Sequence, residues 1–147
     1  MIRVTNMTLS HFELIKDRLL TDFDDFWKPE ILNTELLNEN SKCIIAENSL
    51  GEILGFASIW KAVDDIHITN IAVRKDARTQ GIGSLLLKGI LEISKNYGFQ
   101  SVTLEVKDTN IPAIELYLKH GFKKVGMRKK YYNNTDDAVI MTKEIYE

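Results

Sequence analysis

The feature that most constrains this fold is a turn with two glycines in the middle of the chain, Arg78-Thr-Gln-Gly-Ile-Gly-Ser84. A strand-like apolar run at 66–73 precedes the turn, and an amphipathic, helix-like run at 85–97 follows it. A turn that leads into a helix presents unpaired backbone N–H groups at the positive end of the helix dipole, which suits phosphate. Glycines at 81 and 83 lack the Cβ atoms that would keep a ligand away from this backbone. The segment therefore predicts a strand–loop–helix unit that binds a phosphorylated cofactor.

Two well-known phosphate loops do not fit this turn. A nucleotide P-loop needs Lys-Ser or Lys-Thr after its second glycine, but Gly83 is followed by Ser84-Leu85. The dinucleotide fingerprint follows the first strand and has a third glycine, whereas this turn lies in mid-chain and lacks it. The remaining pattern is Arg/Gln-x-x-Gly-x-Gly, with Arg78, Gly81 and Gly83. Taken alone, the pattern also fits an ordinary surface turn, so the rest of the chain must decide.

The strand before the turn has an irregular apolar pattern. Ile66 and Ile68 share one face of a period-two strand, but Ile71 and Val73 fall on the other face. An extra residue in the strand produces such a change of phase, so the pattern predicts a bulge near Thr69-Asn70. A strand that is buried on both faces would have the same sequence.

Other short apolar runs, bounded by turn residues, predict further strands. They lie at residues 2–5, 43–47, 53–60, 101–106, 125–131 and 138–144. The runs at 43–47 and 53–60 flank Asn48-Ser-Leu-Gly51, which predicts a hairpin. A turn at 133–136 separates the last two strands.

Capping residues and apolar periodicity predict helices between these strands. Ser10, with Glu13 as its reciprocal partner, predicts a first helix whose buried face carries Phe12, Ile15 and Leu19. A second helical stretch is expected at 29–38.

Two further helices follow the glycine turn and the strand at 101–106. The first has an apolar stripe, and Gly98 ends it as a C-cap would. The second, at 111–120, has capping side chains in Asp108-Thr-Asn110, and Gly121-Phe122 suits its end. The stripe of the first consists of Ile82, Leu86, Ile90, Ile93 and Tyr97.

The order of these elements predicts a mixed α/β fold in which helices cover a sheet. A chain of 147 residues, 44% of them hydrophobic, suits one domain over 1–147, and no repeat or long linker divides it. No apolar stretch approaches the ~20 residues of a membrane span and no signal-peptide pattern opens the chain, so the cytoplasm is the expected location. The single cysteine, Cys43, is expected in the core. His11, His67 and His120 lack the spacing of metal ligands, so no metal site is expected.

Five motifs follow one another at close spacing in the second half of the chain. They are Asn70-Ile-Ala-Val-Arg74, Arg78-Thr-Gln-Gly-Ile-Gly83, Leu104-Glu-Val106, Asn110-Ile-Pro-Ala-Ile-Glu-Leu-Tyr117 and Gly121-Phe122. Together they resemble the GNAT superfamily of acetyl-CoA-dependent N-acetyltransferases. The resemblance implies a mixed, mostly antiparallel central sheet flanked by helices. It is dense over 64–142 and thin over 1–60, where Phe26-Trp27 is the main similarity.

The end of the chain resembles one branch of that superfamily. Arg128-Lys-Lys-Tyr-Tyr132, followed by Asp137-Ala-Val-Ile-Met141, is similar to the bacterial ribosomal-protein-alanine N-acetyltransferases. The resemblance implies direct acetyl transfer to the N-terminal α-amine of a protein, with a ribosomal protein beginning with Ala as the first expectation. One alternative is a GNAT enzyme that acetylates a small amine, such as a polyamine or an antibiotic. The other is a non-catalytic acyl-CoA-binding sensor, although both Glu105 and Tyr117 are present.

The resemblance also implies how acetyl-CoA, as a co-substrate, would be bound. The bulge at 69–70 would splay two parallel strands apart and admit the thioester end. The backbone of 71–73 would pair with the pantetheine arm, the N–H groups of 80–84 would bind the pyrophosphate, and Arg78 would add charge. The expected cofactor contacts are Ile71, Ala72, Val73, Arg78, Thr79, Gln80, Gly81, Ile82, Gly83, Ser84 and Asn110.

Glu105 and Tyr117 are the expected catalytic residues. Glu105 lies on the polar side of its strand and would take the amine proton directly or through one water. The alternative is an exposed strand glutamate in an ion pair. Tyr117 would donate to the departing sulfur, and the alternative is an ordinary core tyrosine. Full proton transfer from a phenol to a thiolate is uphill by about 2 kcal/mol, so a hydrogen bond is sufficient.

The acceptor is expected to be an α-amine because of its pKa. An α-amine titrates near 7.8 and a lysine near 10.4, so at neutral pH the α-amine is neutral several hundred-fold more often, a difference of about 3.5 kcal/mol. One glutamate base therefore serves an N-terminus more easily than a lysine. By the resemblance, Trp27, Tyr131 and Tyr132 would surround the first residues of the acceptor.

Charge is unevenly distributed along the chain. Residues 1–50 carry 5 Lys and Arg against 9 Asp and Glu, and this acidic part would attract a cationic N-terminus. A solvated helical face is the alternative. A basic patch at 123–130 could meet cofactor phosphate or RNA, or consist of solvated lysines on a strand pair. Its members are Lys123, Lys124, Arg128, Lys129 and Lys130. Neither direct nucleic-acid binding nor membrane binding is expected, and the sequence indicates no particular oligomeric state.

Overall fold

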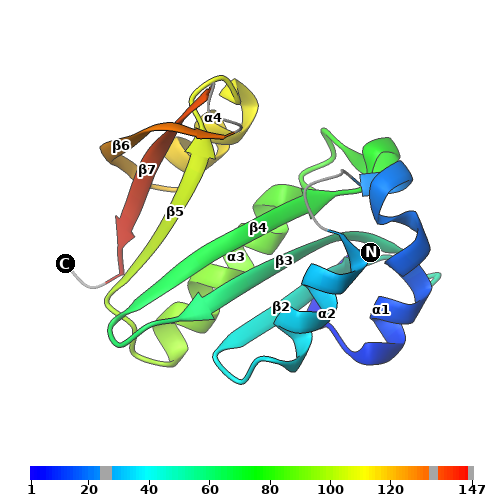
Figure 1. Ribbon diagram of the computed structural model, residues 1–147. Coiled ribbons are helices and arrows are strands. Elements are labelled where there is room, and N and C mark those ends of the chain that lie inside the picture. The colour runs from blue at the N-terminus through cyan, green and yellow to red at the C-terminus, as the bar shows by residue number, and fades with distance from the viewer. Residues whose placement is uncertain (24–27, 133–135, 146–147) are drawn as a thin grey trace.

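The structure is a computed structural model that describes residues 1–23, 28–132 and 136–145, with side chains left out at 20 and 130–132. Its strands form one sheet in the order β1-β2-β3-β4-β5-β7-β6 (Figure 1). The strands are β1 Arg3–Asn6, β2 Ser41–Glu47, β3 Ile53–Lys61, β4 Asp65–Val73, β5 Ser101–Lys107, β6 Lys123–Tyr132 and β7 Asp136–Glu144. The helices are α1 Leu9–Ile15, α2 Pro29–Leu37, α3 Ile82–Asn96 and α4 Ile111–Lys119. Short helical turns are η1 Lys16–Arg18, η2 Leu19–Phe23 and η3 Lys75–Ala77.

Neighbouring strands are antiparallel throughout this sheet except at its centre, where β4 and β5 run parallel. The mixed, mostly antiparallel sheet predicted from the sequence is therefore confirmed. The predicted hairpin is β2–β3, whose turn is closed by hydrogen bonds from the N–H groups of Leu50 and Glu52 to the Asn48 side chain. The predicted turn at 133–136 falls largely outside the described residues.

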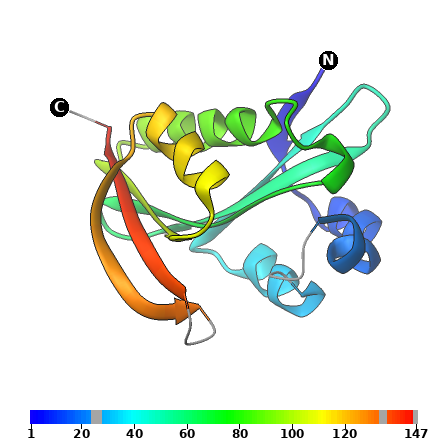
Figure 2. The same ribbon diagram turned by 90° about the horizontal axis from the view of Figure 1, so that it is seen from above.

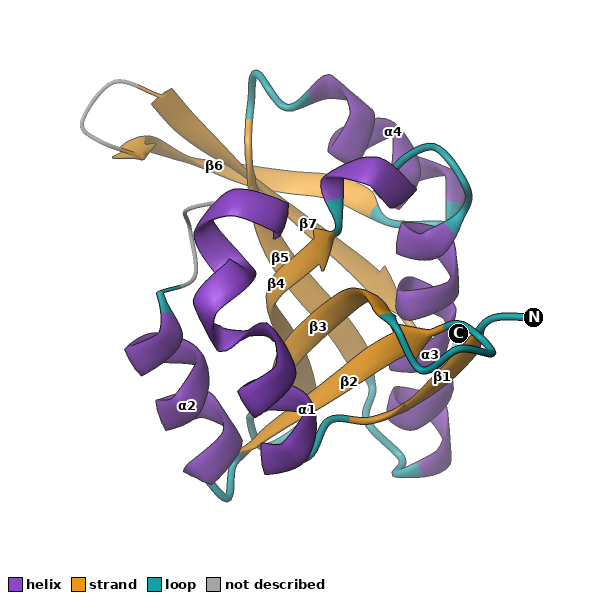
Figure 3. Cartoon of the chain, turned by 90° about the vertical axis from the view of Figure 1, so that its right-hand side faces the viewer, coloured by secondary structure: helices purple, strands orange, loops and turns teal. Residues whose placement is uncertain are grey.

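Helices cover both faces of the sheet, so two cores form. Figure 2 shows α3 and α4 on one face and α1 and α2 on the other, and Figure 3 shows the sheet between them. The alternation of β5 assigns Val102, Leu104 and Val106 to the core under α3 and α4. Cys43 is buried in the second core, under α1 and α2, as predicted.

The start of α1 differs from the prediction. The N-cap is Thr8 rather than Ser10, and its reciprocal partner is His11 rather than Glu13. Thr8 has extended backbone angles and accepts from the His11 N–H, while the Thr8 N–H donates to His11 Nδ1 at 2.9 Å. Because the helix already begins at Leu9, Ser10 lies within its first turn, and Glu13 pairs with Lys16 instead. The predicted buried face holds, since Phe12, Ile15 and Leu19 are all in the core.

The apolar stripe of α3 is confirmed except at its last member. Ile82, Leu86 and Ile90 are fully buried, but Tyr97 is 71% exposed. The helix ends at Asn96 and Tyr97 is its C-cap, so the ring lies beyond the last residue of the helix. The Tyr97 ring instead lies 6.0 Å from the Lys42 ammonium.

The predicted caps of α4 are confirmed. Asn110 is the N-cap, and its side chain accepts from the Ala113 N–H. Gly121, with a φ of 91°, ends the helix, and Phe122 returns its N–H to the Tyr117 carbonyl. Among the described residues, no helix combines the length and apolar character needed to cross a bilayer.

Candidate active site

The centre of the site is the place where β4 and β5 separate. The two strands pair only at Asp65–Ile68 with Ser101–Leu104, and beyond these residues they diverge (Figure 1). The β3–β4 register shifts between Ile68 and Asn70, which makes Thr69 the extra residue and confirms the predicted bulge. The bulge brings Ile71 and Val73 to the same core as Ile66 and Ile68, which explains the change of phase in the sequence. Past the bulge, β4 keeps its partner β3 but has none on the β5 side among the described residues.

The glycine loop follows directly from this open half of β4. Gly81 is the N-cap of α3 with a φ of 82°, and no side chain caps the helix. The first N–H groups of α3, on Ile82, Gly83 and Ser84, are therefore left for a ligand or water. The side chains of 78–80 are exposed, whereas Ile82 is buried and holds the helix on the sheet.

Glycine is favoured at positions 81 and 83 for different structural reasons. Gly81 has the positive φ that favours glycine, and a Cβ there would meet nothing within 4 Å. A Cβ on Gly83 would come 3.3 Å from Leu116 Cδ2, so this glycine allows α4 to pack closely on α3. That either glycine also clears space for a ligand stays a prediction.

Arg78 links the loop to the opposite face of the sheet. Its Nε donates to the Val73 carbonyl at 3.2 Å, and its Nη2 donates to the Phe23 carbonyl at 2.9 Å. Two of its donors are thus engaged by neutral carbonyls at the end of β4 and at η2. The guanidinium keeps its positive charge beside the loop, and it also ties the loop to the segment before residues 24–27.

Glu105 lies on β5, one residue beyond the last pair with β4. Its side chain is 13% exposed, and its Oε1 lies 3.0 Å from Arg128 Nη2 of β6. The ion pair that the sequence left as an alternative is therefore present, with a carboxylate that is largely withdrawn from solvent. Since Leu104 and Val106 point into the α3–α4 core, alternation places Glu105 on the face that carries α1 and α2.

Tyr117 lies on the other side of the sheet. It is buried at 8% exposure in the α3–α4 core, with its ring centroid 5.7 Å from that of Phe122. The neighbouring Leu118 is 46% exposed. Glu105 and Tyr117 thus lie on opposite faces of the sheet.

Two asparagines near the site differ in how their side chains are hydrogen-bonded. Asn110, an expected cofactor contact, is exposed and uses its Oδ1 to cap α4. Asn70 begins the motif at 70–74, and the sequence predicted no contact for its side chain. Its Nδ2 is buried beside the bulge and has no hydrogen-bond partner among the described residues. A buried amide donor without a partner is rare and available to a ligand.

The three predicted acceptor contacts are Trp27, Tyr131 and Tyr132. Trp27 lies outside the described residues, and the side chains of Tyr131 and Tyr132 do as well. Within the basic patch, Arg128 pairs with Glu105, and the side chains of Lys123, Lys124 and Lys129 are exposed. The pairing was not predictable, because it depends on how β6 and β7 align. Over the described residues, no group of His, Cys, Asp and Glu is arranged to hold a metal ion.

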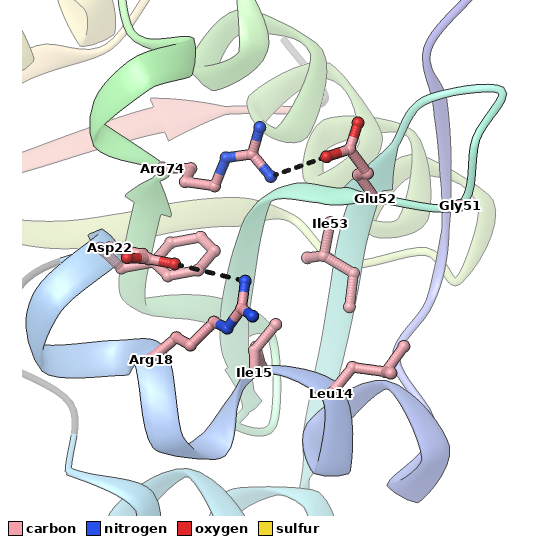
Figure 4. A pocket seen from close by; sticks show the side chains of 9 residues that line it. Leu14, Ile15, Arg18, Asp22, Gly51, Glu52, Ile53 and Arg74 are labelled. Atoms are coloured by element: carbon pink, nitrogen blue, oxygen red, sulfur yellow. Dashed lines mark ion pairs between the residues drawn. The ribbon is translucent and has the colours of Figure 1, made fainter.

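A separate pocket of about 260 Å³ lies between α1, η2 and the β2–β3 turn. Figure 4 shows its apolar base, formed by residues such as Leu14, Ile15 and Ile53. Two ion pairs line it, Arg74 with Glu52 at 3.6 Å and Arg18 with Asp22 at 4.0 Å. None of the predicted catalytic residues lines this pocket.

Comparison with known proteins adds an independent line of observation. Residues 9–122 match the family model described as "Acetyltransferase (GNAT) family". A Bacillus subtilis (strain 168) protein with the provisional name ribosomal protein bS18-alanine N-acetyltransferase is 34% identical over 146 residues, which cover 98% of this chain and 96% of that protein.

Solved structures show the same architecture. The crystal structure of the ribosomal-protein-S18-alanine N-acetyltransferase from Escherichia coli matches with a TM-score of 0.89 and 24% identity, over 100% of this chain and 96% of that one. A GNAT family acetyltransferase from Elizabethkingia anophelis, solved with acetyl-CoA bound, matches with a TM-score of 0.79 and 24% identity, over 97% of each chain. At these identities the two structures establish the fold.

Proposed function

This chain belongs to the GNAT family of acetyltransferases, and from that membership we propose that it transfers the acetyl group of acetyl-CoA to the N-terminal α-amine of a protein. The leading candidate is a ribosomal protein that begins with alanine, which would place the reaction in the cytoplasm. One observation carries the proposal: β4 and β5 separate beyond Ile68 and Leu104, and Glu105 is the first β5 residue past their last pair.

The residues present fit acetyl-CoA as a co-substrate. The uncapped N-terminus of α3 offers the N–H groups of Ile82, Gly83 and Ser84 to the diphosphate, at the positive end of the helix dipole. The edge of β4 at 71–73 faces away from β3 without a strand partner among the described residues, so its amides can pair with the amides of the pantetheine arm. Bound acetyl-CoA supplies an activated acyl carbon as a thioester.

The two faces of the site would then perform different tasks. Glu105 would accept a proton from the attacking amine on the α1–α2 face, directly or through one water. The new C–N bond forms as the C–S bond breaks, and Tyr117 would donate a hydrogen bond to the sulfur from the α4 face. Asn70 Nδ2, buried beside the β4 bulge, would donate to a carbonyl of the acyl group or of the acceptor.

The choice of an α-amine is supported by three observations. A neutral α-amine is far cheaper to obtain at neutral pH than a neutral lysine, so a single carboxylate serves an N-terminus more easily. Residues 1–50, which include the elements on the Glu105 face, carry an excess of four acidic groups. The Bacillus subtilis relative, which aligns over nearly the whole chain, is named for alanine N-acetylation of a ribosomal protein.

The test is mass spectrometry of a peptide that begins with Ala and carries an internal lysine, after incubation with acetyl-CoA. We expect a single acetyl group on the α-amine, and no product from the same peptide with a blocked N-terminus. Acetylation of lysine alone, or of polyamines but no peptide, would replace the proposal with a different acceptor class. Binding of acetyl-CoA without turnover on any amine would indicate a sensor.

A further inference from the structure

The end of α4 contacts the glycine loop through a histidine. His120 directly follows α4, and its Nε2 lies 3.1 Å from Ser84 Oγ in the first turn of α3. Ser84 is one of the residues whose N–H faces the proposed diphosphate site. The side chain of His120 is only partly buried, so it lies between the loop and solvent.

Three lysines surround this histidine. Lys88 lies one turn after Ser84 on α3, Lys119 precedes His120, and Lys143 comes from β7. The Lys143 ammonium passes over Gly121, where an added Cβ would lie 2.6 Å from Nζ. Burial lowers the pKa of the His120 imidazole, and the charges of Lys88, Lys119 and Lys143 lower it further. The charges of all three ammonium groups therefore act on the His120 imidazole.

The positive charge of this group has no carboxylate partner in the part of the chain that the structure describes. None of the three lysines forms an ion pair with a carboxylate of the described residues. Lysines are strongly hydrated point charges that suit a phosphate group. The group begins at Ser84 and extends away from the helix N-terminus toward Lys88, so it lies beside the diphosphate site and does not coincide with it.

Coenzyme A carries a second phosphate, a monoester on the 3′-oxygen of its ribose, next to the diphosphate. We propose that Ser84, Lys88, Lys119, His120 and Lys143 form a subsite for this 3′-phosphate, so that the protein distinguishes CoA from dephospho-CoA. The inference rests on the proposed function, because it takes the diphosphate to lie on the N–H groups of 82–84. A phosphomonoester at Ser84 offers acceptor oxygens to a protonated His120 and to the lysines.

The experiment compares the dissociation constants of CoA and dephospho-CoA by calorimetry at low salt. We expect the unmodified protein to bind CoA about tenfold more tightly, the sum of several partly exposed charge contacts. The double variant Lys88→Gln/Lys119→Gln should lower CoA affinity severalfold and leave dephospho-CoA affinity unchanged, so the ratio approaches one. The matched variant Lys42→Gln/Lys61→Gln removes two charges from the paired ends of β2 and β3, where Lys42 lies beside the Tyr97 ring, and should keep the tenfold ratio.

Two results would overturn the subsite. The first is equal binding of CoA and dephospho-CoA by the unmodified protein. The second is a Lys88→Gln/Lys119→Gln variant that weakens both ligands equally, which would indicate a general field effect. In either case the proposed function still stands, whereas failure to bind either ligand would contradict the function itself.

His120 has a pH signature of its own within this subsite. Phosphate binding favours the protonated imidazole against Lys88, Lys119 and Lys143, so CoA binding should take up a proton near neutral pH. Relative to His120→Gln, the preference of the unmodified protein for CoA over dephospho-CoA should increase severalfold as the pH falls from about 7.5 to about 6. Parallel pH profiles for the two proteins would remove His120 from the subsite.

Discussion

At the scale of single residues, Glu105 and Arg128 come from different strands and meet at 3.0 Å at the edge of the site. Arg128 is 55% exposed and Glu105 13% exposed, so solvent screens the pair and its contribution to stability is modest. An ion pair of this kind does not by itself distinguish a base from a surface glutamate. The two roles of Glu105 can be distinguished by replacing each partner of the ion pair separately and comparing the activities.

Replacing either partner breaks the same ion pair, but only Glu105 is proposed to accept a proton. We expect Glu105→Gln to lower kcat about 10²- to 10⁴-fold, with unchanged acetyl-CoA affinity, because a general base is lost. Arg128→Gln should cost less than about tenfold, since it removes only a screened contact. Steady-state kinetics and calorimetry on both variants would measure this. Equal losses in the two variants would reduce Glu105 to an ion-pair partner.

His120 makes the free energy of unfolding depend on pH. Burial and the neighbouring lysines hold the pKa of the folded imidazole below its ordinary value of 6.5, which the unfolded chain retains. Above that value both states are neutral at this residue and no penalty arises. As the pH falls below it, the unfolded chain takes up the proton first, so the folded state loses stability.

Urea denaturation at several pH values, with His120→Gln alongside, measures this effect. Without ligand, the unmodified protein should lose more stability than the variant between about pH 7 and pH 5. If the two stability profiles stay parallel, burial and the lysine charges do not disfavour the protonated imidazole in the folded protein.

At the scale of elements, the glycine loop is held by backbone conformations that few residues adopt. Thr79 has a φ of 66°, and among the described residues it is the single non-glycine with a positive φ. A β-branched residue is especially disfavoured there, and such strain is often stored at binding loops. Arg78, directly before it, is fixed by its bonds to the Val73 and Phe23 carbonyls. The loop geometry is therefore imposed by its neighbours, at some cost in free energy.

Relief of this strain should be measurable. Asparagine tolerates a positive φ better than threonine, so Thr79→Asn should raise the free energy of unfolding by about 0.5–1 kcal/mol. Thr109→Asn, in a turn without a positive φ, is the matched control and should not stabilise the protein. Chemical denaturation of both variants provides the comparison, and a destabilised Thr79→Asn variant would show that the threonine side chain has a favourable role.

Elements were predictable from the sequence where their causes are local. The alternation of β5, the cap at Asn110 and the bulge near Thr69 each follow from a few adjacent residues. The contacts of Arg128 with Glu105 and of His120 with Ser84 depend on β6–β7 register, which shifts twice, and on how α4 crosses α3. The prediction of Ser10 as the α1 cap was wrong, because the nearby Thr8 side chain can accept the same hydrogen bond and local sequence does not distinguish the two.

At the scale of the whole molecule, the sheet consists of two antiparallel parts, β1–β4 and β5–β7, joined by a short parallel contact. Four residue pairs form that contact, and the strands then separate toward the loop and α4. The site therefore lies between two parts of one sheet, and both parts contribute to the core under α3 and α4.

This arrangement predicts a local pattern of amide hydrogen exchange. Without ligand, those amides of 69–73 that point away from β3 should exchange rapidly, and acetyl-CoA should slow them by pairing with the strand. The amides at 65–68, already paired with β5, serve as the internal reference and should change little. Uniform slowing across both stretches would indicate general stabilisation by ligand and would contradict strand-like pairing.

The unpaired edge of β4 also has a consequence for the chain in solution. An open strand edge invites another strand to add to it, which is a common route to self-association. In this protein the pantetheine arm of the cofactor would act as the protecting strand. Preparations depleted of CoA should therefore aggregate faster on storage than preparations kept with it, and cellular CoA supply would help to keep this chain monodisperse.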